Sequence, residues 1–419
     1  GNAEALERLG DIADAFLLHD RDIYSRYDDS VVRVVDGIVE PVRRARGYAP
    51  HPLPLPFESD VDILATGPEQ KNTFTLITGR HAFVSQHIGD MENAETMEHF
   101  ERTLELYQRL FRIEPRIVAY DLHPEYLSTK YAQTLDLPKI GVQHHHAHVV
   151  SVTAEHGIDE PVVGVTFDGT GFGPDGTIWG GEILLADWVG FERVGHLKTV
   201  PMPGGAAAIR RPARMAVGTL HALGLLDHPG AEPLRSRLAD GEERILAQMI
   251  EKGVNSPLTS SMGRLFDTVA AIAGVRDDAL YEGQAAIELE ARADRHAVGE
   301  YAFDIQDAGG PLLLDQSPVL EAALTDVLEG VPAETISMRF HRAVVRCVVD
   351  VCLAASRQAG TRRAVLVGGV FMNRLVFGGA VSKLAEAGLE PLTHRSLPVN
   401  DGAVSFGQSV VAWANRHGV

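Results

Sequence analysis

The chain has 419 residues, 45% of them hydrophobic and 23% charged, which is enough for two or three domains with their own cores and excludes global disorder. Acidic residues outnumber basic ones by 57 to 38, and the net charge of −19 disfavours broad nucleic-acid binding. No apolar stretch approaches about 18 residues and no basic-then-apolar leader is seen, so we expect neither a membrane span nor a secretion signal. The only two cysteines, Cys347 and Cys352, lie in an apolar run and indicate reduced core residues in the cytoplasm.

The first 56 residues form a unit of their own. The chain begins with Gly-Asn-Ala and then enters what reads as the middle of a domain, so we expect a piece of a longer protein. Residues 4–19 have apolar positions at helical spacing, and the valine-rich run 31–35 predicts a hairpin. The basic segment 43–48 is typical of a solvated face, and the proline-rich stretch 50–56 predicts an extended connector and a domain boundary.

Residues 57–158 predict a first α/β lobe. Three short β-rich runs within 62–86 are separated by polar turns, one of them at Gly79-Arg80, and an amphipathic helix follows over 91–112. Next come strand 116–120, a helix near 125–135, strand 139–142 and a helix over 144–156.

Residues 159–419 repeat this plan with an insertion. Strands are predicted near 161–167, 177–187 and 191–198, followed by a helical insertion over about 204–330. Strand 364–368, helix 373–387, a short strand near 390–394 and helix 401–416 complete the unit. A βββαβαβα order that occurs twice predicts an α/β protein of two similar lobes with a cleft between them.

A histidine-rich run after the predicted strand 139–142 is the strongest local signal. A helix that starts there places His144 and His148 one turn apart on one face, the spacing at which two imidazoles reach one divalent cation. The alternative is a histidine-rich helix start with capping and packing roles. Asp168 and Asp401 lie at the end of a strand and the start of a helix, and would complete a site for Zn, Fe or Mn if the fold brings them in.

Four glycine-rich turns are candidates for a nucleotide phosphate site, because their backbone N–H groups are free to approach a ligand. The alternative for the first of them, 168–173, is an ordinary hairpin turn. Lys71 lies in a predicted turn of the first lobe and either supplies a cation to the phosphates or is simply solvated. The candidate nucleotide-binding residues are Lys71, Asn72, Gly169, Thr170, Gly171, Gly204, Gly205, Glu282, Gly283, Gly368, Gly369 and Asn373.

The chain also contains a serine-capped helix start over 260–267, which we interpret as mainly structural. It has no Gly-x4-Gly-Lys-Ser/Thr loop and no Gly-x-Ser-x-Gly elbow, so the usual NTPase and serine-hydrolase signatures are excluded.

Taken in order, these motifs resemble the C-terminal domain of HypF, the carbamoyltransferase family of nickel–iron hydrogenase maturation. That domain is similar to the TsaD family, whose fold is the actin-like ATPase fold of two ribonuclease-H-like lobes. Residues 4–48 resemble the tail of the YrdC-like domain that precedes it in HypF. The motifs that carry the resemblance are 143–148, 168–173, 179–182, 203–205, 261–267, 281–286, 368–373 and 400–402.

The resemblance implies that the carbamoyl group of carbamoyl adenylate passes to a cysteine thiolate at the C-terminus of HypE, on the way to a cyanide ligand of the hydrogenase iron. It implies a divalent metal, Fe or Zn, and ATP or carbamoyl adenylate as the nucleotide ligand. The implied metal ligands, which are also the implied catalytic residues, are His144, His148, Asp168 and Asp401. Most of the YrdC-like domain is not in this chain, so we expect that the chain alone does not form carbamoyl adenylate.

Departures from the family pattern leave other readings open. Ala206 stands where the pattern has Asp, Arg211 replaces the acid before Pro212, and 66–72 lacks the usual double glycine. The rivals are an O-carbamoyltransferase of nucleosides or sugars, a TsaD-type tRNA enzyme, and a non-catalytic nucleotide-binding scaffold for HypE. In the O-carbamoyltransferases the YrdC-like part follows this domain, so the order seen here favours HypF.

Overall fold

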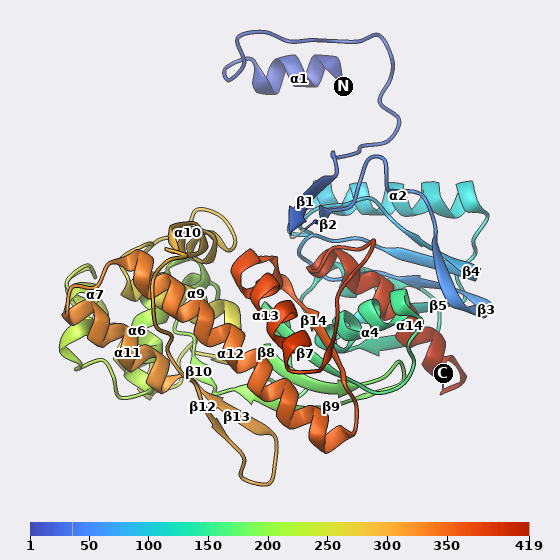
Figure 1. Cartoon of the computed structure of the whole chain (residues 1–419). Helices are drawn as coiled ribbons and strands as arrows, with labels where there is room; N and C mark the ends of the chain where they lie inside the picture. Colours follow the sequence, from blue (N-terminus) through green and yellow to red (C-terminus); the bar gives the residue numbers. More distant parts are fainter. Residues whose placement is uncertain (36, 419) are drawn as a thin grey trace.

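The N-terminal segment of the computed structural model, which describes residues 1–35 and 37–418, extends away from the rest of the molecule (Figure 1). Helix α1 (Asn2–Leu9) is much shorter than the predicted helix 4–19 because it buries none of its residues, and a helix without tertiary packing is marginal. The predicted hairpin is present as β1 (Val31–Val35) and β2 (Ile38–Arg43).

The basic segment 43–48 is not simply a solvated face, as its composition suggested. The Arg44 side chain is buried and donates to the carbonyls of Val84, Tyr48 and His51 at 2.9, 3.1 and 2.8 Å. The segment therefore anchors the hairpin to the first sheet.

The first sheet has the strand order β4-β3-β5-β6, with β3 and β4 antiparallel and the others parallel. Its strands are β3 (Leu53–Ala65), β4 (Thr75–Val84), β5 (Ile117–Asp121) and β6 (Lys139–Val142). One face is covered by α2 (Ala94–Phe111) and α3 (Leu127–Thr134).

Two long strands replace the three short ones predicted at the start of this lobe. The turn expected at Gly79-Arg80 lies inside β4, where Gly79 has φ +52° and pairs with Ser59 at a break in register. Glycine here permits a bulge rather than a reversal of the chain. The connector predicted over 50–56 becomes strand from Leu53 onward, because its prolines alternate with the inward-facing Leu55 and Phe57 and match the two-residue period of β3.

The second sheet runs β12-β13-β9-β8-β7-β14-β15, with β10 and β11 beside β8. An antiparallel meander, β7 to β9, is followed by β14 and β15, which run parallel to β7. This is the strand order of a ribonuclease-H-like lobe. The strands are β7 (Val162–Phe172), β8 (Ile178–Ala186), β9 (Phe191–Leu197), β10 (Val200–Pro201), β11 (Leu258–Thr259), β12 (Asp304–Gln306), β13 (Leu312–Asp315), β14 (Arg363–Val367) and β15 (Glu390–Leu392).

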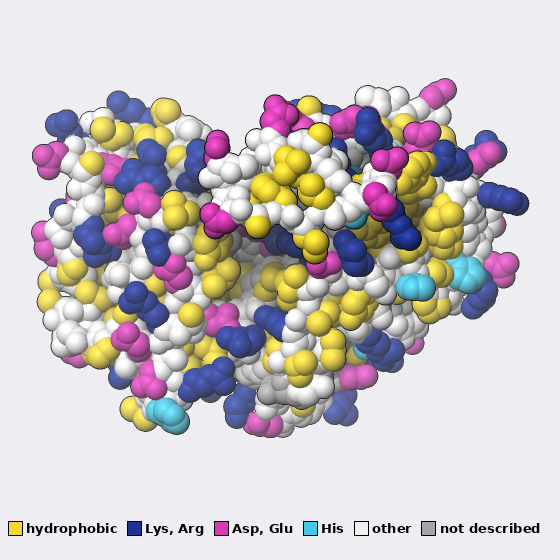
Figure 2. Space-filling model, turned by 90° about the horizontal axis from the view of Figure 1, so that it is seen from above, with side chains coloured by type: hydrophobic (Ala, Val, Ile, Leu, Met, Phe, Trp, Pro, Cys, Tyr) yellow, Lys and Arg dark blue, Asp and Glu magenta, His cyan; other side chains and the backbone are white. Residues whose placement is uncertain are grey.

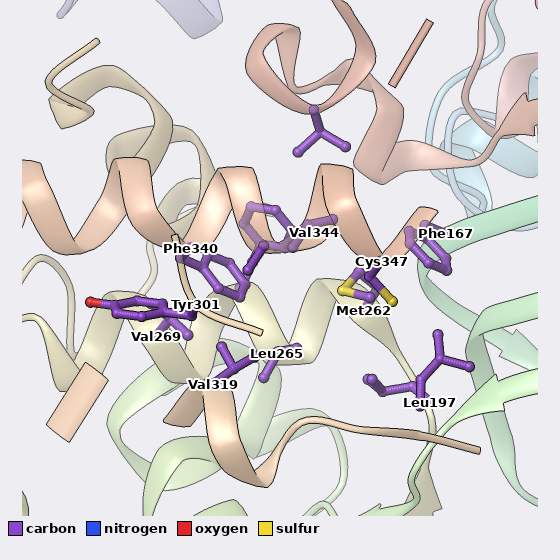
Figure 3. Close-up of a cluster of buried hydrophobic side chains, with 14 of the residues drawn as sticks. Phe167, Leu197, Met262, Leu265, Val269, Tyr301, Val319, Phe340, Val344 and Cys347 are labelled. Carbon is purple, nitrogen blue, oxygen red and sulfur yellow. The ribbon is translucent and has the colours of Figure 1, made fainter. Parts of the chain in front are cut away.

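Helices cover this sheet, many of them from the predicted insertion. A core forms where α9 and α12 meet the sheet, and Figure 3 shows Leu265 and Val269 of α9 close to Phe340 of α12. Cys347 and Cys352 are buried on α12 and unpaired, as expected for reduced core residues. The helices are α5 (Ala206–Arg210), α6 (Pro212–Ala222), η1 (Pro229–Ala231), α7 (Glu232–Arg235), α8 (Glu242–Glu251), α9 (Met262–Ile272), α10 (Gln284–Arg292), α11 (Ser317–Leu328), α12 (Ala333–Ala359), η2 (Gly369–Met372) and α13 (Arg374–Glu386).

Two helices lie between the sheets. Helix α4 (His144–His156) packs Val149 and Val152 against the second sheet, and its opposite side contacts α14 (Val404–Asn415), which follows η3 (Asp401–Ala403) and precedes η4 (Arg416–Gly418). Although α14 comes late in the chain, it packs on the first sheet. The crossing is close: a Cβ on Gly407 would lie 1.8 Å from the Ala147 carbonyl oxygen. The beginnings of α4 and η3 therefore meet at one place.

None of the helices in residues 1–35 and 37–418 combines the length and the hydropathy needed to span a bilayer.

Candidate metal and nucleotide site

Four side chains from three segments converge between the sheets. His144 and His148 lie one turn apart on α4, Asp168 is on β7, and Asp401 begins η3. One ligand atom from each lies within 4.8 Å of the other three, and all four residues are buried. His148 Nε2 lies 3.2 Å from Asp168 Oδ2 and 3.5 Å from Asp401 Oδ1. The four residues singled out in the sequence are thus one cluster.

The His144 ring has the environment of a metal ligand. Its Nδ1 donates to Asp121 Oδ2 at 2.8 Å, which leaves Nε2 to face the cluster. Nε2 is buried and has no hydrogen-bond partner among the described residues, lying 3.6 and 3.7 Å from the nearest oxygens of Asp168 and Asp401. A carboxylate behind an imidazole whose other nitrogen is free is the usual support of a ligating histidine. The residues therefore fit a divalent cation.

The charges of the cluster are strongly coupled. Burial by itself lowers the pKa of His144, but the carboxylates of Asp401, Asp121 and Asp168 outweigh it and hold that pKa well above the usual value. Burial acts in the opposite direction on the acids, yet the two imidazoles hold the pKa of Asp168 well below its usual value and bring the pKa of Asp401 to about 2. Both carboxylates are therefore ionised at neutral pH. The negative charge of the two carboxylates is balanced either by protons on the two imidazoles or by a metal ion that displaces those protons.

The glycines around Asp168 shape the backbone on both sides of it. The predicted turn 168–173 is mostly strand, since β7 continues to Phe172 with a register break between Phe167 and Gly171. The N–H groups of Gly169 and Gly369 donate to Asp168 Oδ1 at 2.7 and 3.3 Å. Gly368 has φ +104°, and a Cβ there would lie 2.4 Å from the Phe167 carbonyl oxygen. The end of β14 can therefore come close to β7 only with glycine at this position.

Gly171 lies beside the histidine run of α4, and Lys71 lies close enough to Asp401 to be affected by its charge. Gly171 is pressed against His145, where a Cβ would lie 2.4 Å from ring atom Cε1, and Thr170 is half-buried. Lys71, in the left-handed region at φ +47°, forms an ion pair with Glu282 at 2.5 Å. Burial lowers the pKa of Lys71, but Glu282 and Asp401 raise it more, so the amine stays charged. The charged Lys71 side chain thus links the first lobe to Glu282, which lies just before Gly283 and α10.

The remaining candidates have structural partners. Asn72 is buried and donates to the carbonyls of Thr66 and Pro68, so it holds its own loop. Asn373 caps α13 by accepting from the N–H groups of Leu375 and Val376. Its Nδ2 donates to His341 Nε2 at 2.8 Å.

Gly204 and Gly205 lie at the start of α5, where the Gly204 N–H donates to the Asn255 carbonyl at 2.7 Å. Within the described chain, the neighbours that a Cβ would meet at Gly204 and Gly205 are Ala207, Arg214 and Asn255, none of which belongs to the cluster. Nearby, Arg211, which departs from the family pattern, pairs with Glu242 and Asp278.

Sequence reasoning missed Asp121, and it included Glu182 only as the last residue of the motif 179–182. Asp121 ends an apolar strand just as Asp168 follows one, so the same position at a strand end was the signal available. Glu182 is fully buried and accepts from Arg193 Nε at 2.6 Å and Ser260 Oγ at 2.5 Å. The motif did not predict the partners of Glu182, because they come from β9 and from the loop before α9.

Models of known protein families match most of this chain. Residues 58–155 match the family described as "HypF Kae1-like domain", and residues 164–408 match "Carbamoyltransferase, Kae1-like Domain, second subdomain". Carbamoyltransferase HypF2 of Cupriavidus necator is 42% identical over 98% of this chain and 54% of its own length. A carbamoyltransferase HypF homolog of the same organism is 36% identical over 85% of this chain and 93% of its own length.

Two solved structures of HypF proteins are similar to this chain over nearly all of its length. The crystal structure of full-length HypF in the phosphate- and nucleotide-bound form has a TM-score of 0.95 at 42% identity, covering 99% of this chain and 65% of that one. The T. kodakarensis HypF structure has a TM-score of 0.88 at 31% identity, covering all of this chain and 56% of that one. The chain spans about half the length of HypF2 and similar curated relatives. The two family matches and these identities together establish that this chain belongs to the HypF family of carbamoyltransferases.

Proposed function

We propose that this chain transfers a carbamoyl group from carbamoyl adenylate to the C-terminal cysteine thiolate of HypE, for the cyanide ligands of a nickel–iron hydrogenase. The thiolate sulfur bonds to the carbamoyl carbon, the bond from that carbon to the phosphate oxygen breaks, and AMP leaves. The observation that carries the proposal is the buried His144–His148–Asp168–Asp401 cluster with its free imidazole nitrogen. The names of the relatives, and the nucleotide and phosphate bound to one of them, support the reaction class.

The four cluster residues would hold the metal. Two imidazole nitrogens and two carboxylate oxygens suit Zn or Fe. When bound, the cation supplies a Lewis acid that polarises the carbamoyl carbonyl. Asp121 keeps the proton of His144 on Nδ1, so that Nε2 offers its lone pair to the cluster.

The rest of the site serves the nucleotide. Lys71 carries a positive charge at the rim, and we propose that it meets the phosphate of the adenylate in place of Glu282. We propose that the phosphate lies beside the glycine turns at 169–171 and 368–369, although the N–H groups of Gly169 and Gly369 already donate to Asp168. The attacking thiolate belongs to HypE, which agrees with the burial of both cysteines of this chain: burial raises the pKa of Cys347 and Cys352 and makes them poor nucleophiles.

Transfer by the His148→Ala variant tests the proposal. The assay supplies carbamoyl adenylate and HypE to the purified chain and follows carbamoylation of the HypE C-terminus by mass spectrometry. We expect loss of transfer with retention of HypE binding. The matched control is His156→Ala on the same helix, whose Nε2 bonds to the Thr393 carbonyl away from the cluster.

Three results would contradict the proposal. Normal transfer by His148→Ala removes the metal from the mechanism. Absence of transfer by the wild type, with HypE still bound, favours the scaffold reading. Transfer to a nucleoside or sugar in place of HypE favours an O-carbamoyltransferase.

A further inference from the structure

The β1–β2 hairpin joins the first lobe to η2, which contacts Asp168, and to the residue before Asp401. On one side, buried Arg44 donates to the Val84 carbonyl of β4, and the Arg44 carbonyl accepts from the His87 N–H at 3.0 Å. On the other side, the hairpin contacts η2 and the residue before Asp401. In Figure 1 the hairpin lies above the region where the sheets meet. It is therefore placed to affect both segments.

Arg33 of β1 makes the first contact. Its guanidinium donates to the carbonyl of Met372, to the carbonyl of Phe371 at 3.4 Å, and to Glu40 Oε2 at 2.9 Å. The last carbonyls of a short helix lack partners within it, and a cation there is favourable. Arg33 thus caps the end of η2, whose first residue, Gly369, donates its N–H to Asp168.

Asn400 makes the second contact. Its Nδ2 donates to the Val42 carbonyl of β2 at 3.0 Å, and its Oδ1 accepts from the Gly402 N–H at 3.1 Å. The side chain is buried and caps η3, the helix that begins with Asp401. A single amide therefore links the hairpin to the turn that presents the second carboxylate.

We propose that the β1–β2 hairpin positions the metal-binding carboxylates, with Arg33 acting on Asp168 through η2 and Asn400 acting on Asp401 through η3. Neither residue touches the cluster, so both are positioning residues. The inference rests on the proposed metal site. It gives residues 31–43 a part in the chemistry of a site whose ligands lie more than 100 residues later in the chain.

Cobalt titration of the whole chain tests the inference, because the visible spectrum of bound Co²⁺ reports the geometry of its ligands. We expect Arg33→Ala to weaken Co²⁺ binding about 10-fold and to change the spectrum, as loss of an outer support does at other metal sites. The control is Arg46→Ala, three residues after the end of the hairpin at Arg43. The exposed Arg46 side chain pairs with Asp29. Its affinity and spectrum should equal those of the wild type.

Amide hydrogen exchange separates this inference from the proposed function. With the metal absent, we expect the Gly369 N–H to exchange faster in Arg33→Ala than in the wild type, even if the wild type binds no Co²⁺ and the proposed metal site fails. If Arg33→Ala does not fold, Arg33→Gln keeps a donor but loses the charge and the fork, and serves in its place. Wild-type Co²⁺ affinity and spectrum, or unchanged exchange at Gly369, in a folded Arg33 variant overturns the inference.

Discussion

Asp121 is a carboxylate that orients a candidate metal ligand without being one itself. Its Oδ2 accepts from His144 Nδ1, and its Oδ1 accepts from the His123 N–H at 3.0 Å, so the side chain is held from two directions. The pair His144 and His148 was predictable because helical spacing alone places both rings on one face. The contact of Asp121 with His144 was not predictable, because it depends on β5 and β6 lying side by side.

Replacement of Asp121 by Asn should weaken the metal site while leaving the ligands in place. Asn keeps an acceptor for His144 Nδ1 but removes the negative charge that makes the ring a better ligand. We expect a 10- to 100-fold loss of Zn²⁺ affinity, measured by calorimetry. Asp136→Asn, an exposed acid before β6, is the control and should bind as the wild type does. Equal affinities for Asp121→Asn and wild type would show that Asp121 has no part in the site.

Helix α4 is attached at its far end to the loop that leads to Asp401. Glu155 accepts from His394 Nδ1 at 2.7 Å and from the N–H groups of Arg395 and Ser396 at 3.0 and 2.9 Å. The helix itself followed from the sequence pattern: a helix was predicted from about 144 to 156, and α4 is His144–His156. The hydrogen bonds of Glu155 could not be predicted, because they join residues about 240 positions apart.

The Glu155 contacts predict a pH dependence of stability. Burial raises the pKa of Glu155, but the bonds from His394, Arg395 and Ser396 lower it more, to below the usual 4.5. A carboxyl with a lowered folded-state pKa stabilises the fold above its unfolded-state value and loses that contribution as the pH falls through the folded-state value.

Glu155→Gln should therefore lower the free energy of unfolding at pH 7 by about 1–3 kcal/mol, and the difference from wild type should shrink as the pH falls below 4.5. Urea unfolding of both proteins from pH 7 to pH 3 measures it. Glu160→Gln, which removes an exposed ion pair with Arg363, should change stability by less than about 0.5 kcal/mol. A difference that does not vary with pH would mean that the charge of Glu155 is irrelevant.

At the scale of the molecule, the candidate site lies where parts from both halves meet. Figure 2 shows acidic and basic side chains interspersed on the face seen from above. The duplicated plan predicted an α/β protein of two lobes, and the structure has two main sheets, but the first sheet begins with two strands where the plan had three. The boundary near residue 158 stays a prediction. The packing of α4 on the second sheet and of α14 on the first was not predictable, because periodicity shows which face of a helix is apolar and not which sheet covers that face.

A metal that joins α4, β7 and η3 should stabilise the whole fold. A ligand that binds only the folded state adds about 2.7 kcal/mol when its concentration is 100 times its Kd. Addition of Zn²⁺ to the chelator-treated chain should therefore raise the Tm, and a chelator should lower it again. His148→Ala should show neither change. If Zn²⁺ does not change the Tm of the wild type, or if it still raises the Tm of His148→Ala, then the four-residue cluster is not the Zn²⁺ site.

The packing of α14 on the first sheet has a consequence for synthesis on the ribosome. The face of that sheet that α14 covers carries Phe57, Ile63 and Ile77, and it stays uncovered until residues 404–415 have left the exit tunnel. Contacts so distant along the chain form slowly, and exposed apolar surface in a nascent chain invites aggregation. We therefore expect the first lobe to stay incompletely folded while the second is being made, and the nascent chain to need a holding chaperone until α14 emerges.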